Sequence, residues 1–290
     1  MTTNYGNELR LLMCGLYTEK ELDQIRKATI AIAGVGGGNG SYILALLCRK
    51  GFEHFTLSDP ERYEPRNISR QLFANNTTLG KLKLDIAIEH MLRINPNIQY
   101  ATVPKIELDT IEDFIQSATV VSYQAENFSP WILTHYICSK YSIPFVNVSR
   151  KDNLRTTMNL KIVDYRKTGN VFKIEEINFN SFGIDKTTSH KIIKMFHSEK
   201  LDNKLLEAAD NIHIQFKKQK RFKNLSIAYP EVGDISNKFP NDYYKRYTDP
   251  ENCYVAAALA CRAITDLVIG RTTRINGINE LNIFSDYQIS

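Results

Sequence analysis

The chain has 290 residues, of which 43% are hydrophobic, and it carries 37 Lys and Arg against 32 Asp and Glu, a formal net charge of +5. This length and apolar content suffice for a full hydrophobic core and exclude a disordered chain. The first residues lack a basic segment followed by an apolar one, and no apolar run approaches the ~18 residues of a membrane span. We therefore expect a cytoplasmic protein with no membrane segment.

In chain order, a helical pattern over residues 9–27 precedes a short apolar run at residues 29–33 that predicts a buried parallel strand. Glycines follow this strand, and an apolar helical run begins at Ser41. Glycines in such a turn let backbone N–H groups approach a phosphate, and the next helix directs its positive dipole end there. The pattern favours a phosphate-binding loop over a merely tight turn, and its candidate residues are Gly34, Gly36, Gly38 and Gly40.

A second strand at residues 55–57 leads to Asp59, about 20 residues beyond the glycine loop, where an acidic side chain meets ribose hydroxyls. Polar and basic residues follow it closely. Two cations beside the phosphates suit displacement at phosphorus, in which developing charge is neutralised, better than hydride transfer. The candidate catalytic residues are Asn67, Arg70, Gln71 and Lys83.

Four sequence elements, in their order and spacing, resemble the ThiF/MoeB/HesA family, the relatives of ubiquitin-activating enzymes. The matching elements are the glycine loop, Asp59, the Asn-x-x-Arg-Gln element at residues 67–71 and the Gly-x-x-Lys element at residues 80–83. The resemblance implies a Rossmann-like fold and an ATP-dependent adenylyltransferase. The implied substrate is the C-terminal carboxylate of a small ubiquitin-like or sulfur-carrier protein, or of a peptide.

The chain also departs from the family pattern. One additional glycine, most simply Gly37, widens the loop by up to ~3.5 Å. Glu126 stands where relatives have an aspartate that helps to hold Mg²⁺, and Trp131 stands where many have arginine. The resemblance therefore implies a magnesium ligand at Glu126 with altered geometry. A nucleotide-binding scaffold without turnover stays open as an alternative.

The remaining pattern predicts a helix over residues 79–93, further strands at 98–103, 118–123 and 143–146, and antiparallel strands from residue 154. A long apolar helix at 254–269 and a strand at 281–287 close the chain. We expect an α/β protein with a doubly wound, mostly parallel sheet and an antiparallel C-terminal portion. It forms one ThiF-like domain with a nucleotide-binding half, residues 1–150, and a substrate or dimer half, residues 151–290.

The five cysteines form no C-x-x-C pair, so their spacing indicates neither a zinc site nor a disulfide framework. By resemblance, the chain therefore fits the zinc-free branch of the family. Cys253 precedes the long apolar helix, resembles the reactive cysteine of some relatives and is a candidate nucleophile. Cys48, Cys138 and Cys261 lie on apolar helical faces and are expected to be core residues.

A basic insertion at residues 186–223 holds ten Lys or Arg and four acidic residues, a local charge of +6. It is either a solvated face or a surface for an acidic partner or RNA. The family's tRNA branch, which dehydrates threonylcarbamoyl-adenosine, is the alternative function and makes tRNA an alternative partner. The resemblance also implies a homodimer, with Arg10 as the candidate residue that one subunit contributes to the other.

Overall fold

The computed structural model describes residues 13, 15–150, 157–167, 169–228, 250–271 and 277–282. Its centre is a seven-stranded sheet with the order β3-β2-β1-β4-β5-β6-β7. The first five strands in that order are parallel, and β6 and β7 join antiparallel. The strands are β1 (Thr29–Ala33), β2 (His54–Ser58), β3 (Gln99–Thr102), β4 (Val120–Tyr123), β5 (Phe145–Arg150), β6 (Thr157–Val163) and β7 (Gly277–Asn282).

The central strands are apolar throughout because both faces of the sheet are covered. Along β1, Ile30 and Ile32 point into one core, and Ala31 and Ala33 point into the other. Ala33 pairs with Ser58 on one side and with Tyr123 on the other, so the chain turns that follow these strands open at the same edge of the sheet.

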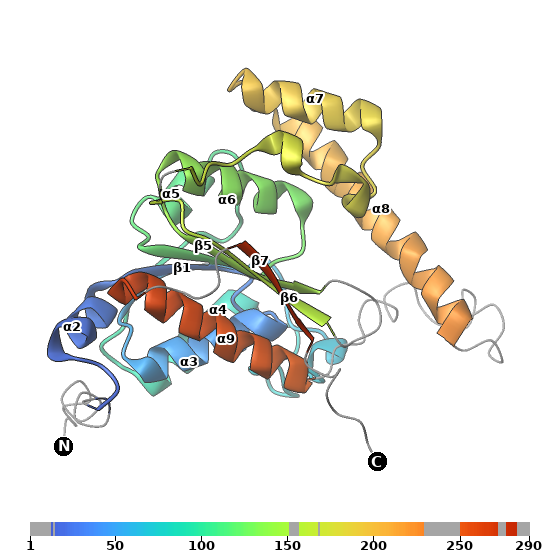
Figure 1. The fold of residues 1–290 in the computed structure, drawn as a ribbon. Helices are drawn as coiled ribbons and strands as arrows, with labels where there is room; N and C mark the ends of the chain where they lie inside the picture. The colour runs from blue at the N-terminus through green and yellow to red at the C-terminus, as the bar shows by residue number, and fades with distance from the viewer. Residues whose placement is uncertain are drawn as a thin grey trace, which may run out of the picture.

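Among the described helices, four pack directly on one face of the sheet, and two pack directly on the other (Figure 1). On the first face lie α2 (Glu19–Lys27), α3 (Gly38–Lys50), α4 (Lys83–Ile94) and α9 (Pro250–Ile269). On the second lie α5 (Ile111–Ile115) and α6 (Phe128–Lys140). Helix α2 starts with a capping box in which Thr18 and Glu21 bond each other's backbone N–H groups, and α3 ends at Gly51 with φ +96°.

The basic segment lies outside α6. Its residues form α7 (Lys186–His197) and most of α8 (Asn203–Ala228), after the short 3₁₀ turns η2 (Ile174–Glu176) and η3 (Phe179–Phe182). Helix α8 passes the start of α6 and extends away from the sheet (Figure 1). Asp210 of α8 accepts a hydrogen bond from the backbone N–H of Ser129 at 2.9 Å, which caps α6 and attaches α8 to it.

The predicted fold class is confirmed, including the antiparallel C-terminal strands. Helix α4 begins at Lys83 rather than at residue 79, because Leu82 bridges to Arg62 and the preceding residues form a turn. The last strand spans residues 277–282 rather than 281–287, and residues 283–290 lie outside the described part. Ile32, from the first half of the chain, and Ile264, from the second, pack in the same hydrophobic core. The functional division of the domain into two halves at residue 150 stays a prediction.

Candidate active site

The loop between β1 and α3 is built from glycines because other parts of the protein press against it. Gly34 has φ +73°, and a Cβ there would lie 2.9 Å from the backbone nitrogen of Ala125. At Gly40 a Cβ would lie 2.1 Å from the carbonyl oxygen of Gly34. A side chain at either position would force the helix or the next strand away from the loop. Gly37, the additional glycine, is the N-cap of α3, and its N–H closes the turn on Gly34 at 3.0 Å.

The N-terminus of α3 presents unused hydrogen-bond donors. Within the part of the chain that the structure describes, no acceptor meets the backbone N–H groups of Gly38, Asn39 and Gly40. The first turn also lacks an acidic side chain that would neutralise the dipole. Three N–H groups at the positive end of a 13-residue helix are chemically able to receive an anion. This is the place that the glycine pattern predicts for the phosphates.

Asp59 follows β2 directly and is only 4% exposed. Its Oδ2 accepts from the Gly36 N–H at 2.9 Å, and its Oδ1 accepts from the Glu61 N–H at 3.1 Å. Burial raises the pKa of Asp59, while Lys83 and the two N–H donors act in the opposite direction. Asp59 therefore fixes the glycine loop to the end of β2, a role that the sequence pattern did not indicate. Its predicted contact with a ribose stays a prediction.

Lys83, the first residue of α4, lies directly beneath the loop and is 2% exposed. A Cβ at Gly36 would lie 2.4 Å from the Lys83 Cβ, so only glycine fits above the lysine. The Lys83 ammonium pairs with the Glu61 carboxylate at 2.6 Å and lies 5.8 Å from the centre of the Tyr63 ring. The Glu61 side chain is 68% exposed, whereas the Lys83 side chain is 3% exposed.

The Asn-x-x-Arg-Gln element lies against the start of α3. Asn67 is buried, and its side-chain oxygen accepts from the Glu64 N–H at 2.9 Å, so this amide shapes its own loop. Arg70 is 4% exposed and donates from Nη1 to the Arg66 carbonyl at 2.8 Å. The Arg70 carbonyl oxygen lies 3.7 Å, and the Arg70 Cγ 3.9 Å, from the position of a Cβ at Gly38. The Arg70 segment thus packs against the N-terminus of α3.

Two buried amide oxygens near this terminus have no hydrogen-bond partner within the described residues: Oδ1 of Asn39 and Oε1 of Gln71. The segments that carry them are joined, because the Leu72 N–H donates to the Ser41 Oγ at 3.1 Å. Buried polar atoms without protein partners are rare, so each of these two oxygens is able to accept a further hydrogen bond. Gln71 was a predicted site residue, whereas Asn39 was missed because the family motif is carried by glycines on either side of it.

Glu126 lies in the turn after β4, close to the loop. The neighbouring Ala125 and Gln124 form the backbone wall behind Gly34. The Glu126 side chain is exposed, and the ammonium of Lys217 on α8 lies 3.8 Å from its Oε2 and 2.9 Å from its carbonyl oxygen. Within the described residues no three acidic, His or Cys side chains gather into a metal cluster. A magnesium role for Glu126 stays a prediction.

Cys253 contacts the glycine loop from the start of α9. It is 3% exposed, and its Sγ would lie 2.8 Å from a Cβ at Gly38. The sulfur thus fills the space that this glycine leaves. Sequence reasoning missed the contact because 215 residues separate the partners, and a catalytic role for the buried thiol stays a prediction. Cys48 and Cys261 are core residues as expected, and burial raises the pKa of each thiol to about 12.

The structure therefore brings most of the predicted residues to one loop. Arg70 lies beside the N-terminus of α3, Asp59 and Lys83 lie beneath the loop, and Cys253 touches it. Glu126 lies behind it, in contact with α8. Arg10 falls outside the described residues.

The chain belongs to the ThiF family, whose profile matches residues 9–221. It is similar to the tRNA threonylcarbamoyladenosine dehydratase of Haemophilus influenzae, with 35% identity over 108 residues, which are 37% of this chain and 38% of that protein. It is also similar to ubiquitin-like modifier-activating enzyme 5 of Caenorhabditis elegans, with 31% identity over 110 residues. That match covers 38% of this chain and 25% of the nematode protein.

Among solved structures, the fold resembles the microcin C7 biosynthetic enzyme MccB in complex with N-formylated MccA. The TM-score is 0.61 with 17% identity, over 97% of this chain and 73% of that chain. This likeness supports the fold described above. The expectation of a ThiF/MoeB/HesA protein, made from the ordered motifs at residues 34–83, is confirmed by the family profile.

Proposed function

We propose that the protein uses ATP to adenylate a carboxylate, most consistently the C-terminus of a small ubiquitin-like or sulfur-carrier protein or of a peptide. One observation carries the proposal: the three unused N–H groups of α3 lie with Arg70 at the helix start and Lys83 beneath the loop. A helix terminus with a cation on either side suits a polyphosphate, because negative charge grows on the leaving pyrophosphate during the reaction.

In this reaction a carboxylate oxygen attacks the α-phosphorus of ATP, the bond to the bridging oxygen breaks, and pyrophosphate leaves with that electron pair. The N–H groups of Gly38, Asn39 and Gly40 hold phosphate oxygens. Arg70 and Lys83 neutralise the charge that grows on the leaving pyrophosphate, after Lys83 exchanges Glu61 for phosphate. Gln71 and Asn39 position the nucleotide, and Asn67 keeps the Arg70 segment in place.

Magnesium belongs to the proposal as the usual companion of ATP. Mg²⁺ binds through one or two carboxylates together with phosphate oxygens. Glu126 is an exposed carboxylate on the turn behind Gly34 and fits this requirement, whereas the Asp59 carboxylate already accepts two backbone hydrogen bonds. When bound, the ion supplies positive charge to the phosphates.

A tRNA substrate is the second candidate, because the Haemophilus influenzae relative is a tRNA threonylcarbamoyladenosine dehydratase. The carboxylate would then be that of the modified nucleoside. The basic helices α7 and α8 favour this candidate, since Lys191, Lys194 and Lys204 are exposed on them. The chemistry at α3 is the same in both cases, so the two candidates differ in what binds outside the nucleotide site.

A homodimer in the cytoplasm completes the proposal. Ile68, beside Arg70, is 42% exposed, and Tyr254, beside Cys253, is 53% exposed. Apolar side chains exposed around a site favour its covering by another surface. Light scattering at micromolar concentration gives the mass directly, and a monomeric mass contradicts this part.

The reaction is tested by ATP–pyrophosphate exchange with each class of acceptor in turn: a ubiquitin-like protein, a sulfur-carrier protein, a peptide with a C-terminal carboxylate, and tRNA carrying threonylcarbamoyl-adenosine. We expect exchange with one class and none without an acceptor. Calorimetry with ATP and with NAD is the companion measurement. ATP binding without exchange for every class identifies a scaffold without turnover, and NAD binding without ATP binding contradicts the proposal.

A further inference from the structure

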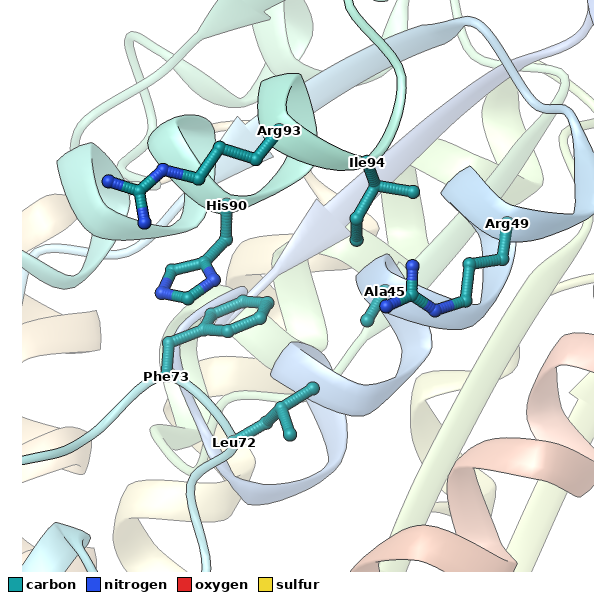
Figure 2. A pocket seen from close by; sticks show the side chains of 7 residues that line it. All are labelled: Ala45, Arg49, Leu72, Phe73, His90, Arg93 and Ile94. Atoms are coloured by element: carbon teal, nitrogen blue, oxygen red, sulfur yellow. The ribbon is translucent and has the colours of Figure 1, made fainter. Parts of the chain in front are cut away.

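A pocket of about 470 Å³ opens between α3 and α4 (Figure 2). Residues 72 and 73, which follow the Arg70 segment, complete its wall. Four lining side chains are apolar, and three are basic. The apolar ones are Ala45, Leu72, Phe73 and Ile94, and the basic ones are Arg49, His90 and Arg93.

The pocket is positively charged at neutral pH. Arg49 and Arg93 lie in the last turns of α3 and α4 and are both exposed. Arg93 pairs with Glu89 on its own helix, but no acidic residue lines the pocket among the residues that the structure describes. Burial and then Arg93 lower the pKa of His90, so the two guanidinium groups carry the charge. An occupant of this pocket is expected to be anionic.

The apolar part of the pocket suits an aliphatic group. Phe73 is 2% exposed, and the His90 ring already stacks on it at a centroid distance of 4.6 Å and an interplanar angle of 15°. This stack leaves no bare aromatic face of Phe73 for a nucleobase. Leu72, in contrast, is 43% exposed. Base stacking contributes about 1–3 kcal/mol per base to the binding of single-stranded RNA, and this lining offers no ring face for it, so the lining favours an aliphatic side chain over a nucleotide.

The pocket is also connected to the nucleotide site. The Leu72 N–H is bonded to Ser41 in the first turns of α3, and Leu72 comes directly after Gln71. An occupant that contacts Leu72 therefore touches the same short segment that positions Arg70. This places the pocket where a bound partner is held close to the adenylation site without entering it.

We propose that this pocket anchors an acidic segment of a protein partner, with one aliphatic side chain in the apolar part and flanking carboxylates paired with Arg49 and Arg93. Burial of one aliphatic side chain and two exposed ion pairs supplies a weak, salt-sensitive anchor. The proposal concerns binding alone and does not rest on the adenylation reaction.

Methyl NMR of the full chain tests it, because this method detects millimolar binding. The probe is a blocked pentapeptide with one leucine between two pairs of glutamates, and its control has serine in place of leucine. We expect saturable shifts of the Ala45, Leu72 and Ile94 methyl signals with the leucine peptide. The affinity of the serine peptide is expected to be lower by about tenfold or more, which is the scale for losing one buried aliphatic side chain.

Three variants make the assignment specific. Arg49→Glu with Arg93→Glu is expected to weaken peptide binding about tenfold or more, on the scale of two ion pairs turned into repulsions. Leu72→Ser alters an exposed apolar side chain and is expected to abolish saturation. Arg26→Glu is the matched control, because Arg26 also pairs with an acid on its own helix, α2, and is 47% exposed. It is expected to bind like wild type.

The proposal is wrong if the leucine peptide shifts none of the three methyl signals, or if the serine peptide binds equally well. Arg26→Glu reverses one charge where the paired variant reverses two, so the proposal is also wrong if Arg26→Glu produces about half of the paired change in binding free energy, which would report only the net charge. A decauridylate added under the same conditions gives the remaining outcome. If it shifts these methyl signals and the peptide does not, the pocket binds RNA instead of an acidic peptide.

Discussion

The Asp59 carboxylate accepts a hydrogen bond from the Gly36 backbone N–H at 2.9 Å, although 23 residues separate them. Its other oxygen holds the Glu61 N–H. Asp59, which is predicted to bind ribose, thus also holds the glycine loop in place. Loss of this side chain is therefore expected to affect the shape of the loop as well as the nucleotide contact.

Asp59→Ala should weaken ATP binding by about 10-fold to 100-fold, because two N–H groups lose a charged acceptor worth ~1.5–3 kcal/mol each, in part replaced by water. Asp59→Asn keeps one acceptor oxygen and should lie between wild type and alanine. Calorimetry gives the affinities, and urea unfolding gives the stability loss. ATP affinity equal to wild type in Asp59→Ala, with the protein folded, would contradict the role in the loop.

Glu61→Gln should raise ATP affinity about 2-fold to 5-fold at low salt, because the carboxylate that competes with phosphate for Lys83 is removed. Lys83→Met should have the opposite effect. Glu64→Gln is the matched control, since Glu64 is a similarly exposed carboxylate of the same loop that pairs with Arg66. If both glutamate variants change affinity alike, the gain reflects net charge and not exchange at Lys83.

Arg70→Ala should slow ATP–pyrophosphate exchange by about 10²–10³, the scale for losing one preorganised donor, with a smaller change in ATP affinity. The reason is that the charge on pyrophosphate grows only as it leaves. Arg66→Ala serves as control, because the Arg66 side chain pairs with Glu64 in the same loop. Equal exchange rates in Arg70→Ala and wild type would show that residues 67–71 are only loop structure.

Gly38→Ala should lower the free energy of unfolding, because its Cβ would lie 2.8 Å from the Cys253 Sγ. In a Cys253→Ala background the sulfur is absent, and the same change should cost little. The double-mutant cycle is expected to give a coupling of about 1–3 kcal/mol in urea unfolding. Additive effects would mean that the two residues do not touch. Cys253→Ser should leave pyrophosphate exchange unchanged, since any thiol step follows adenylation.

His213 predicts a specific acid sensitivity of α8. Burial, and then Lys217, lowers the pKa of His213 to about 4, and its Nδ1 lies 3.0 Å from the Phe182 carbonyl oxygen. A folded-state pKa below the unfolded value gives stability that is present above pH ~6.5 and is lost as the pH falls toward 4. At pH 5 the loss amounts to about 2 kcal/mol.

His213→Asn keeps a donor for the Phe182 carbonyl and removes the titration. Urea unfolding at pH 7.5 and pH 5.0 should therefore show a smaller difference in the variant than in wild type. The comparison of the two differences removes the contributions of other groups, such as Asp210, whose pKa is raised by burial. Equal differences in the two proteins would contradict the assignment.

Local sequence pattern sufficed for the parallel sheet, for the glycine loop and for the placement of Lys83 at the start of a helix. These depend on short-range signals: buried strand runs, glycines at a turn and a motif of fixed spacing. Three contacts were not predictable: the ion pair of Lys83 with Glu61, the packing of Cys253 against Gly38, and the hydrogen bond from Lys217 to Glu126. Each joins side chains from separate elements, and a single sequence does not record which surfaces meet.

The contacts of Lys217 and Cys253 fall on the two ends of one loop. Lys217 binds Glu126 on the turn behind Gly34, and Cys253 touches Gly38 at the other end of the same loop. Helices α8 and α9, which both follow residue 150, therefore support the turn between β1 and α3. A substitution that displaces either helix is expected to alter the shape of this turn, even though it lies far from the turn in the sequence.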